Sequence, residues 1–253
     1  MSKLVSMPQP VLYIFAISHY CEKARWALDH YGIAYRLHPT MPGMNRKIAK
    51  RLGSNAGSMP FLQIGDNLIT GSSAIIDWGE HNRHDDRASL NGEDPEQVSA
   101  IEKRLDDIVG VHIRRYYYSA ALLTAPASVR PIFSDGLPFV QKMMVMLGWK
   151  KIVPVMIKLM DLGLEQGAQS RDILGSELDW LDALLSDGRP YLTGNAFTRA
   201  DITAASLLAP LINPPKHPTY KALQIPSELH DDMAIWRERP IIRWVNKMYT
   251  AHR

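Results

Sequence analysis

The stretch VLYIFAISHYCEKARWAL, residues 11–28, decides the fold of the first part of the chain. Residues 11–17 are mostly β-branched, aromatic or aliphatic, which predicts a buried strand. From Cys21 onward, apolar side chains recur every three or four residues until Gly32, which predicts a helix and its end. Ser18 lies between the two elements and is therefore the predicted cap of the helix.

The first turn of this predicted helix is suited to an anion. Its N–H groups have no acceptor inside the helix, and together with the helix dipole they stabilise negative charge by a few tenths to about 2 kcal/mol. The spacing of Ser18 and Cys21 is that of a Cys-x-x-Cys redox site whose first sulfur is replaced by oxygen. A thiolate here would belong to Cys21 or to a bound ligand. The simpler alternative is that Ser18 only caps the helix and Cys21 is inert.

A second ligand-binding element is predicted at Met59 and Pro60. A short strand at residues 34–37 and a basic helix at 45–52 come first, and an apolar strand at 61–64 follows directly. Proline cannot donate to a sheet ladder, so Pro60 belongs at the start of that strand. If the bond before it is cis, the Met59 N–H and C=O face outward and can pair with a peptide-like ligand. The alternative is an ordinary trans proline.

Ser72 and Ser73 open the next predicted helix, directly after a strand at residues 68–70. The helix start is a second candidate anion site, although plain capping also explains the two serines. The order of elements is strand, helix, strand and then strand, strand, helix. This order is typical of a thioredoxin-like α/β domain.

Three segments, residues 18–28, 55–60 and 72–75, together resemble the N-terminal domain of cytosolic glutathione transferases of the serine or cysteine type. The resemblance implies a thioredoxin-like glutathione-binding domain at residues 1–85. It also implies an all-helical domain at residues 93–253 that contributes the pocket for the second substrate. Glutathione as co-substrate and a homodimer follow from the same resemblance.

The resemblance assigns roles to particular residues. The hydroxyl of Ser18 would donate a hydrogen bond to the glutathione thiolate. The main chain of Met59, beside a cis Pro60, would pair with the cysteinyl unit. Ser72 would bind the γ-glutamyl carboxylate at the helix start, with Ser73 beside it.

Two positions depart from the pattern of the family. Members usually carry an acidic residue or Gln before the binding serine, where this chain has Gly71. Tyrosine-type members carry their catalytic Tyr in the first strand, where this chain has Ile14. The neighbouring Tyr13 would point to the opposite face of the sheet, because side chains alternate along a strand.

The remainder of the chain is predicted to be helical. Tyr116, Tyr117 and Tyr118 end a helix at residues 100–121 and either line the second-substrate pocket or pack in the core. The Met-rich segment 137–164 is too interrupted by lysines to span a membrane. It is predicted to form a core helix pair, with an adaptable wall for apolar ligands and attachment to a membrane surface as alternatives.

Composition limits the remaining possibilities. The chain has 253 residues, 46% of them hydrophobic, which is sufficient for two cored domains. A formal net charge of +3, without blocks of like charge, gives no indication of nucleic-acid binding. A single cysteine and a start without a long apolar core suggest a reducing cytoplasm. His81 and His84 flank a polar helix end with Asp85 and Asp86 nearby, but a solvated surface explains them better than a metal site.

Three functional hypotheses result. The first is a glutathione-dependent transferase in which Ser18 activates the thiolate for attack on an electrophilic, apolar substrate. The second is a glutathione-linked thiol-disulfide oxidoreductase that uses Cys21. The third is a binding or scaffold protein that has the fold without the chemistry, a hypothesis motivated by Gly71 and the unusual Met-rich segment.

Overall fold

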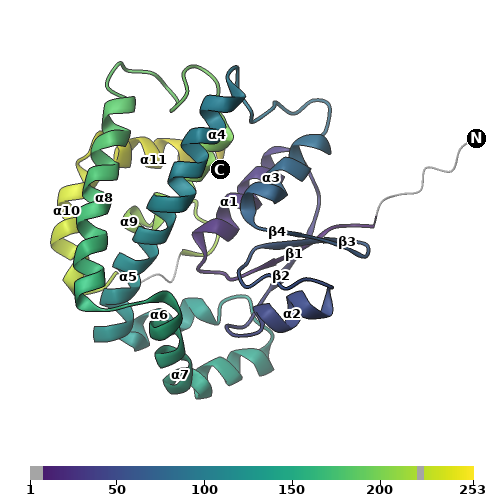
Figure 1. Ribbon diagram of the computed structural model, residues 1–253, viewed down its shortest axis with the longest axis vertical. Helices are drawn as coiled ribbons and strands as arrows, with labels where there is room; N and C mark the ends of the chain where they lie inside the picture. Colours follow the sequence, from purple (N-terminus) through teal and green to yellow (C-terminus); the bar gives the residue numbers. More distant parts are fainter. Residues whose placement is uncertain (1–7, 221–224) are drawn as a thin grey trace, which may run out of the picture.

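The computed structural model describes residues 8–220 and 225–253, and Figure 1 shows a small sheet with helices beside a larger group of helices. The sheet has four strands in the order β2-β1-β3-β4. Strand β1 is parallel to β2 and antiparallel to β3, and β3 is antiparallel to β4. The strands are β1 (Val11–Ile14), β2 (Arg36–Pro39), β3 (Phe61–Ile64) and β4 (Asn67–Thr70).

The two parallel strands differ slightly from their predicted bounds. Strand β1 ends at Ile14, three residues before the end of the predicted strand, because the chain turns there: the Ser18 N–H donates to the Phe15 carbonyl oxygen at 3.0 Å. Strand β2 begins two residues later than predicted and includes Pro39. It lies at the edge of the sheet, where a proline leaves no ladder bond unmade.

Helices cover both faces of the sheet. Helices α1 (His19–His30) and α3 (Ser72–His81) lie on one face, and α2 (Asn45–Arg51) lies on the other (Figure 1). The sheet and these helices enclose their own buried apolar cluster, which includes Leu12, Ile14, Leu28, Phe61 and Ile75. The predicted thioredoxin-like arrangement is confirmed.

Beyond α3 the described residues form helices, apart from one isolated bridge between Tyr191 and Gly194. The predicted helix at residues 100–121 lies within a longer run in which a π-helical turn joins α4 to α5. The elements are α4 (Pro95–Arg104), η1 (Leu105–Val109), α5 (Gly110–Thr124), α6 (Pro126–Phe133), α7 (Phe139–Met160), α8 (Leu164–Leu184), α9 (Arg199–Ile212), η3 (Ser227–Leu229), α10 (His230–Arg237) and α11 (Pro240–His252).

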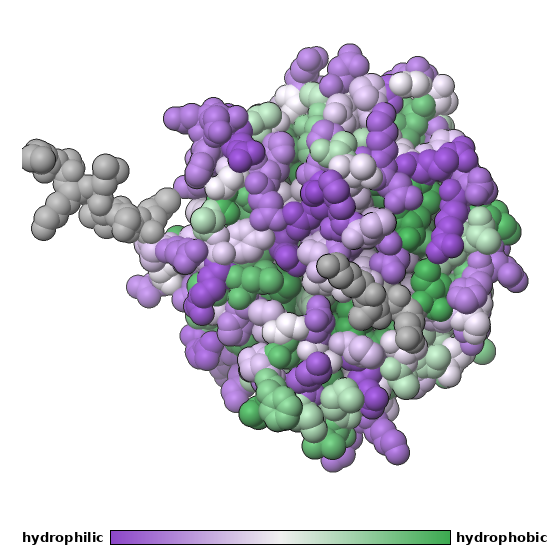
Figure 2. Space-filling view, turned by 180° about the vertical axis from the view of Figure 1, so that it is seen from behind, coloured by the Kyte–Doolittle hydropathy of each residue, from purple (hydrophilic) through white to green (hydrophobic). Residues whose placement is uncertain are grey.

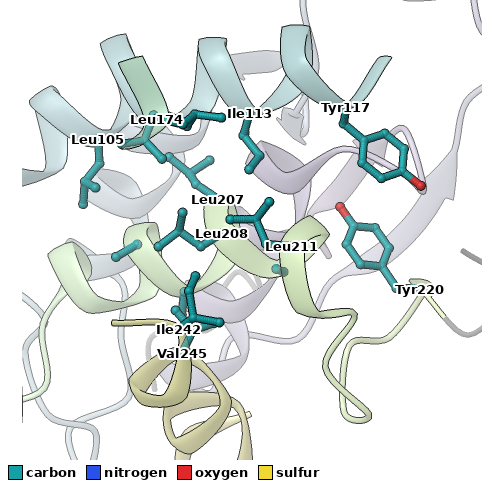
Figure 3. Packing of buried hydrophobic residues seen from close by; sticks show 14 of the residues in the cluster. Leu105, Ile113, Tyr117, Leu174, Leu207, Leu208, Leu211, Tyr220, Ile242 and Val245 are labelled. Carbon is teal, nitrogen blue, oxygen red and sulfur yellow. The ribbon is translucent and has the colours of Figure 1, made fainter. Parts of the chain in front are cut away.

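Helix α9 is the centre of the helical part. Every residue from 199 to 211 is buried. Figure 3 shows leucines of α9 between α5 and α8 on one side and α11 on the other. The labelled core residues are Leu105, Ile113, Leu174, Leu207, Leu208, Leu211, Ile242 and Val245.

The start of α9 is closed by a capping box, which the Thr-x-x-Asp spacing of Thr198 and Asp201 before an apolar run predicts. The Asp201 carboxylate accepts the Thr198 backbone N–H at 2.7 Å and the Thr198 hydroxyl at 2.8 Å. It also accepts the Leu192 backbone N–H at 2.8 Å. Asp201 is fully buried, so these donors replace the water that a carboxylate would otherwise bind.

The Met-rich segment forms α7 and, as predicted, does not cross a membrane. Of the helices in the described part of the chain, none is both long enough and apolar enough for that. The prediction of a core helix is largely wrong, since only Val145, Trp149 and Val153 of α7 are buried.

Candidate active site

Three chain segments meet at the edge of the sheet that is formed by the ends of its strands. In the register of the strands, Tyr13 pairs with Phe61 and Phe61 pairs with Thr70. Because β1 and β4 both run antiparallel to β3, the residues after β1, before β3 and after β4 lie at the same edge. A hydrogen bond of 3.0 Å from the Gly71 N–H to the Pro60 carbonyl oxygen joins two of these segments.

This edge carries four of the residues that the sequence predicts to bind a ligand. Ser18 follows β1 and precedes α1, while Met59 and Pro60 come directly before β3. Ser72 is the first residue of α3, which follows β4. The Met59–Pro60 peptide bond is cis, as predicted. The topology therefore brings these four residues together although more than fifty positions separate Ser18 from Ser72.

Ser18 is the cap of α1, as predicted. Its backbone is extended, and its Oγ accepts the Cys21 backbone N–H at 3.3 Å. Its side chain is half-buried. Capping uses a lone pair of the hydroxyl oxygen and leaves the hydroxyl proton to be donated. Ser18 can therefore cap the helix and donate to an anion at the same time.

The loop that carries Ser18 is held from the far end of the chain. The Thr219 hydroxyl donates to the Ala16 carbonyl oxygen at 2.7 Å. The Tyr220 hydroxyl donates to the Ile17 carbonyl oxygen at 3.1 Å. Both donors follow α9, so the helical part of the protein fixes the position of the α1 start.

Cys21 lies one turn further into α1 and is buried. Only 1% of its surface is exposed, and it packs in the apolar cluster under the sheet. Burial raises the pKa of the Cys21 thiol to about 11, which outweighs the lowering by its hydrogen bond with Ser18 and by the Arg25 charge. The helix start favours a thiolate, but desolvation of the sulfur opposes it and is the larger effect.

The start of α3 differs from its prediction. Gly71, and not a serine, is the cap residue, and it makes no side-chain capping bond. Its φ of +90° lies in a region that L-residues rarely adopt, so an acidic residue or Gln would be strained there. Ser72 is the buried first residue of the helix. The first N–H groups of α3 are thus left without a side-chain cap, next to Ser72.

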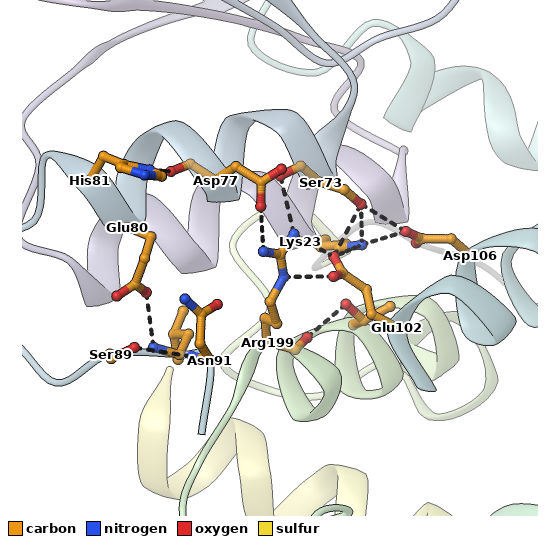
Figure 4. A network of polar contacts seen from close by, with 12 residues as sticks. Lys23, Ser73, Asp77, Glu80, His81, Ser89, Asn91, Glu102, Asp106 and Arg199 are labelled. Atoms are coloured by element: carbon orange, nitrogen blue, oxygen red, sulfur yellow. Dashed lines mark hydrogen bonds and ion pairs between the residues drawn. The ribbon is translucent and has the colours of Figure 1, made fainter. Parts of the chain in front are cut away.

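Ser73 faces a buried group of charges between the two parts of the protein (Figure 4). Lys23 of α1 is fully buried, and its Nζ lies 2.7 Å from Glu102 Oε1 and 2.6 Å from Asp106 Oδ2. Ser73 Oγ accepts a hydrogen bond of 3.1 Å from Lys23 Nζ. The same oxygen lies 3.0 Å from each of the two carboxylates. The Ser73 hydroxyl is therefore part of this cluster and does not join Ser72 at the edge of the sheet.

Arg199 completes the cluster from the start of α9. Its Nε lies 2.5 Å from Glu102 Oε2, and it also pairs with Asp77 of α3. Burial alone would raise the pKa of Glu102, but Lys23 and Arg199 hold it below its ordinary value. Burial does raise the pKa of Asp106, against the opposing effect of Lys23. The cluster ties α1 and α3 to α4, η1 and α9.

The sequence analysis missed this cluster. Lys23, Glu102 and Arg199 are far apart in the chain, and pairing between them cannot be found from local spacing. One signal was available, because Lys23 precedes Trp26 and Ala27 by three and four residues and so shares their buried face of α1. A lysine on a buried face requires an acidic partner.

A small cavity lies next to Ser18, between the two parts of the protein. Its lining includes Ile17, which directly precedes Ser18, and Ile113, Tyr117 and Tyr118 of α5. Tyr220 faces Tyr117 across it (Figure 3). Two of the three predicted pocket tyrosines therefore line a cavity, although all three are also buried in the apolar core.

Besides the tyrosines, the polar residues that line the cavity are His19 and Arg114, whereas Tyr116 and Tyr13 lie elsewhere. His19 lines it and donates through Nε2 to the Gly110 carbonyl oxygen at 3.1 Å. Burial, with a smaller contribution from Arg114, lowers the pKa of His19 to about 3, so its ring is neutral at pH 7. Tyr116 points elsewhere and donates to Asp232 at 3.0 Å. Tyr13, on β1, donates to Gln63 at 2.9 Å.

No group of three or more His, Cys, Asp or Glu side chains in residues 8–220 and 225–253 is arranged to hold a metal ion. The candidate site itself offers the Ser18 hydroxyl, the main chain at Met59 and the starts of α1 and α3.

The sequence of residues 12–87 matches the family model "Glutathione S-transferase, N-terminal domain". This domain belongs to the glutathione S-transferase family. A search of curated protein sequences found no match. The family assignment therefore rests on the domain that carries Ser18, Met59 and Ser72.

Solved structures extend the likeness to the fold of the whole chain. Glutathione transferase GSTFuA3 from Phanerochaete chrysosporium shares 16% identity, with 98% of each chain covered and a TM-score of 0.63. The β-etherase LigF from Sphingobium shares 17% identity, with 95% of this chain and 99% of LigF covered and a TM-score of 0.58. A Ceriporiopsis subvermispora glutathione S-transferase in complex with glutathione shares 15% identity, with 96% of each chain covered and a TM-score of 0.58. The chain has the glutathione transferase architecture.

Proposed function

We propose that the protein is a glutathione-dependent transferase in which Ser18 activates the glutathione thiolate. The observation that carries the proposal is the position of Ser18. Its half-buried hydroxyl caps α1 in a glutathione S-transferase domain, at the sheet edge that also holds Met59 and Ser72. Glutathione is the co-substrate in this proposal, as it is the ligand of the Ceriporiopsis relative.

Each binding residue has a distinct task. The Ser18 hydroxyl donates to the sulfur, and the first N–H groups of α1 add their dipoles. A fall of about two units in the pKa of the thiol corresponds to roughly 2.7 kcal/mol, which a hydroxyl donor and a helix start can supply together. The main chain of Met59 pairs with the cysteinyl unit. Ser72 and the uncapped N–H groups of α3 hold the γ-glutamyl carboxylate.

The electrophile binds on the side of Ser18 where the small cavity lies; because that cavity has a volume of only about 20 Å³, its lining side chains must move apart to admit a substrate. Tyr117, Tyr118 and Ile113 line the cavity and favour an apolar or aromatic substrate. Glutathione loses its thiol proton to solvent, and the sulfur then forms a bond to the electrophilic carbon as the leaving group departs with its electron pair. A homodimer, a cytoplasmic location and the domain bounds 1–85 and 93–253 are further parts of the proposal that rest on the family resemblance.

The alternative in which Cys21 is the nucleophile is less well supported. A thiol that is buried and has a raised pKa is neither accessible nor ionised at neutral pH. A disulfide exchange reaction requires both properties. The scaffold alternative would require that glutathione does not bind.

Two measurements test the proposal. Calorimetric titration with glutathione should show saturable binding at millimolar or lower concentration, and its absence would favour the scaffold hypothesis. Ser18→Ala should lower the rate of glutathione conjugation to an aryl halide by about a hundredfold, the effect of losing one donor to a developing anion. Cys21→Ala is the matched control and should keep conjugation. If conjugation is unchanged in Ser18→Ala and reduction of a glutathione mixed disulfide is lost in Cys21→Ala alone, the oxidoreductase hypothesis replaces the proposal.

A further inference from the structure

Helix α7 packs against the rest of the protein with one side, on which Ile152, Met156, Ile157 and Met160 are partly buried and three further residues are buried. Val145, Trp149 and Val153 are buried and recur every four residues along one side of the helix. Trp149 Nε1 donates to the Pro126 carbonyl oxygen at 2.7 Å, and its ring lies 5.3 Å from that of Phe133. These contacts fix the orientation of the helix, so its other sides face away from the core.

The outward side of α7 carries the largest concentration of exposed apolar residues in the described chain. Seven of the eleven large apolar residues found exposed lie on this helix, and Leu147 and Phe139 are 81% and 77% exposed. The seven are Phe139, Val140, Met143, Met144, Leu147, Val155 and Leu159. Figure 2 shows apolar side chains interspersed with polar ones at the lower end of the molecule, the end at which Figure 1 places α7. Single exposed leucines are ordinary, but such a concentration on one helix marks an interaction surface.

The charge of the same helix is of one sign. Residues 139–160 contain four lysines and no aspartate or glutamate. The lysines, Lys142, Lys150, Lys151 and Lys158, are all exposed. On α7 the lysines lie among the exposed apolar side chains, and the absence of acidic residues from the helix suits contact with the headgroup region of an anionic membrane.

We infer that α7 binds the surface of membranes that contain anionic lipid, with the helix lying in the plane of the interface. At 1.5 Å per residue its 22 residues span about 33 Å, which offers a long line of contact. The apolar side chains enter the boundary between headgroups and acyl chains, while the flexible lysines reach the lipid phosphates. The helix does not cross the bilayer, consistent with the absence of a spanning helix among the described residues.

A second copy of the chain is a poorer occupant of this face. A two-fold symmetric contact would place the lysines of one α7 close to those of the other, with no acidic residue on either helix to offset them. An acidic protein partner also has the right charge, and a failure to bind anionic vesicles would favour it over lipid. The lipid surface fits both the apolar content and the uniform charge.

Sedimentation with lipid vesicles tests the inference on the full chain. The protein should pellet with vesicles of phosphatidylcholine and phosphatidylglycerol, but not with phosphatidylcholine alone, and binding should weaken as salt is added. Reversal of two charges in Lys150→Glu/Lys151→Glu should reduce the partition coefficient about tenfold or more. Leu147→Ser should reduce it about fivefold, because less apolar surface enters the interface.

Matched controls show whether a loss of vesicle binding is specific to α7 or follows from any change in net charge or exposed apolar surface. Arg237→Glu/Lys247→Glu makes the same change in net charge at exposed positions of α10 and α11. Ile235→Ser removes an apolar side chain that is 66% exposed on α10. Both controls should bind vesicles like the unmodified protein. None of the altered residues belongs to the candidate active site, so conjugation activity should be unaffected.

Three outcomes would overturn the inference. The first is no binding to anionic vesicles at low salt. The second is equal loss of binding in the α7 variants and in their controls, which would mean a nonspecific charge effect. The third is concentration-dependent self-association in ultracentrifugation that Leu147→Ser abolishes, because a second copy would then cover the face.

Discussion

In two regions of this molecule, side chains are buried or exposed contrary to what is usual for their residue type. One region buries a charged side chain, and the other exposes apolar ones. At the junction of α1, α4 and α9, Lys23 has none of its surface exposed, although lysine is among the residues least often buried. On α7, Leu147 has 81% of its surface exposed, although leucine is usually inside. The difference between the two lies in whether the chain itself supplies a partner.

The partner is present in the first region and missing in the second. Lys23 lies within 2.7 Å of Glu102 and Asp106, and Arg199 completes the arrangement, so the buried charges compensate one another. Leu147 and its exposed neighbours have no such compensation inside the described chain. Where the chain itself supplies the partners of an unusually placed side chain, as for Lys23, the arrangement is structural. Where it does not, as for the exposed apolar residues of α7, the side chains indicate a binding partner outside the molecule.

The largest expected effect is at Lys23. Replacing it with Met keeps the length of the side chain but leaves the partly buried Asp106 without a cation and the buried Glu102 with Arg199 alone, which should lower the free energy of unfolding by about 3–5 kcal/mol. Lys150→Met, at an exposed position of α7, is the matched control and should change stability by less than about 0.5 kcal/mol. Urea denaturation measures both. Equal effects at the two positions would contradict the distinction drawn between the regions.

A somewhat smaller loss of stability is expected from a change at Asp201, a buried acid whose partners are neutral donors. Asp201→Ala leaves the Leu192 N–H and both donors of Thr198 buried without an acceptor, which should cost about 3 kcal/mol. Asp94→Ala is the control, because Asp94 caps α4 through a single exposed bond to the Gln97 N–H and should cost about 1 kcal/mol. The two variants compare a buried capping carboxylate with an exposed one. A smaller loss for Asp201→Ala than for Asp94→Ala would show that burial does not strengthen the capping interaction.

The outcome of sequence-based prediction follows the same division between local and long-range causes. The Ser18 cap and the Thr198 capping box depend on neighbours in sequence, and each was predicted. The residues left the bond before Pro60 open between cis and trans, and the family resemblance implied the cis form that the structure has. The cluster of Lys23, Glu102 and Arg199 depends on three helices meeting, and it was not predicted. Its neighbour Ser73 was predicted to bind a ligand because local spacing makes it equivalent to Ser72.

Two further properties, the protonation of Cys21 and the exposure of α7, could not be read from the sequence, for identifiable physical reasons. The sequence favours a thiolate at Cys21 because the helix start is visible in the pattern, while the burial that raises its pKa depends on packing against the sheet. The sequence favours a core position for α7 because the segment is apolar. Whether other elements cover a helix is decided by tertiary structure, and only one side of α7 is covered.

The next prediction concerns the Cys21 thiol, because burial raises its pKa while the helix start lowers it. With a pKa of about 11 in place of 9.0, its thiolate fraction at pH 7.5 is about a hundredfold lower than that of an unperturbed thiol. Alkylation by iodoacetamide should therefore be at least that much slower in the native protein than in urea. The native rate should rise about tenfold per pH unit up to the pKa, because a raised pKa leaves the thiol protonated until then. Mass spectrometry follows the modification, and a native rate that levels off below pH 8 would restore Cys21 as a candidate nucleophile.

The smallest expected effect concerns the outward face of α7. Leu147→Ser should change the free energy of unfolding by less than about 0.5 kcal/mol, because a side chain that is mostly exposed in the folded protein gains little by folding. Val145→Ser, two residues earlier on the buried stripe, should cost about 2–4 kcal/mol, because it leaves a cavity and buries a hydroxyl. Thermal unfolding of the two variants separates the faces of one helix. If Leu147→Ser were as destabilising as Val145→Ser, the outward face would be covered within the protein itself, and its exposed apolar side chains would no longer require a membrane.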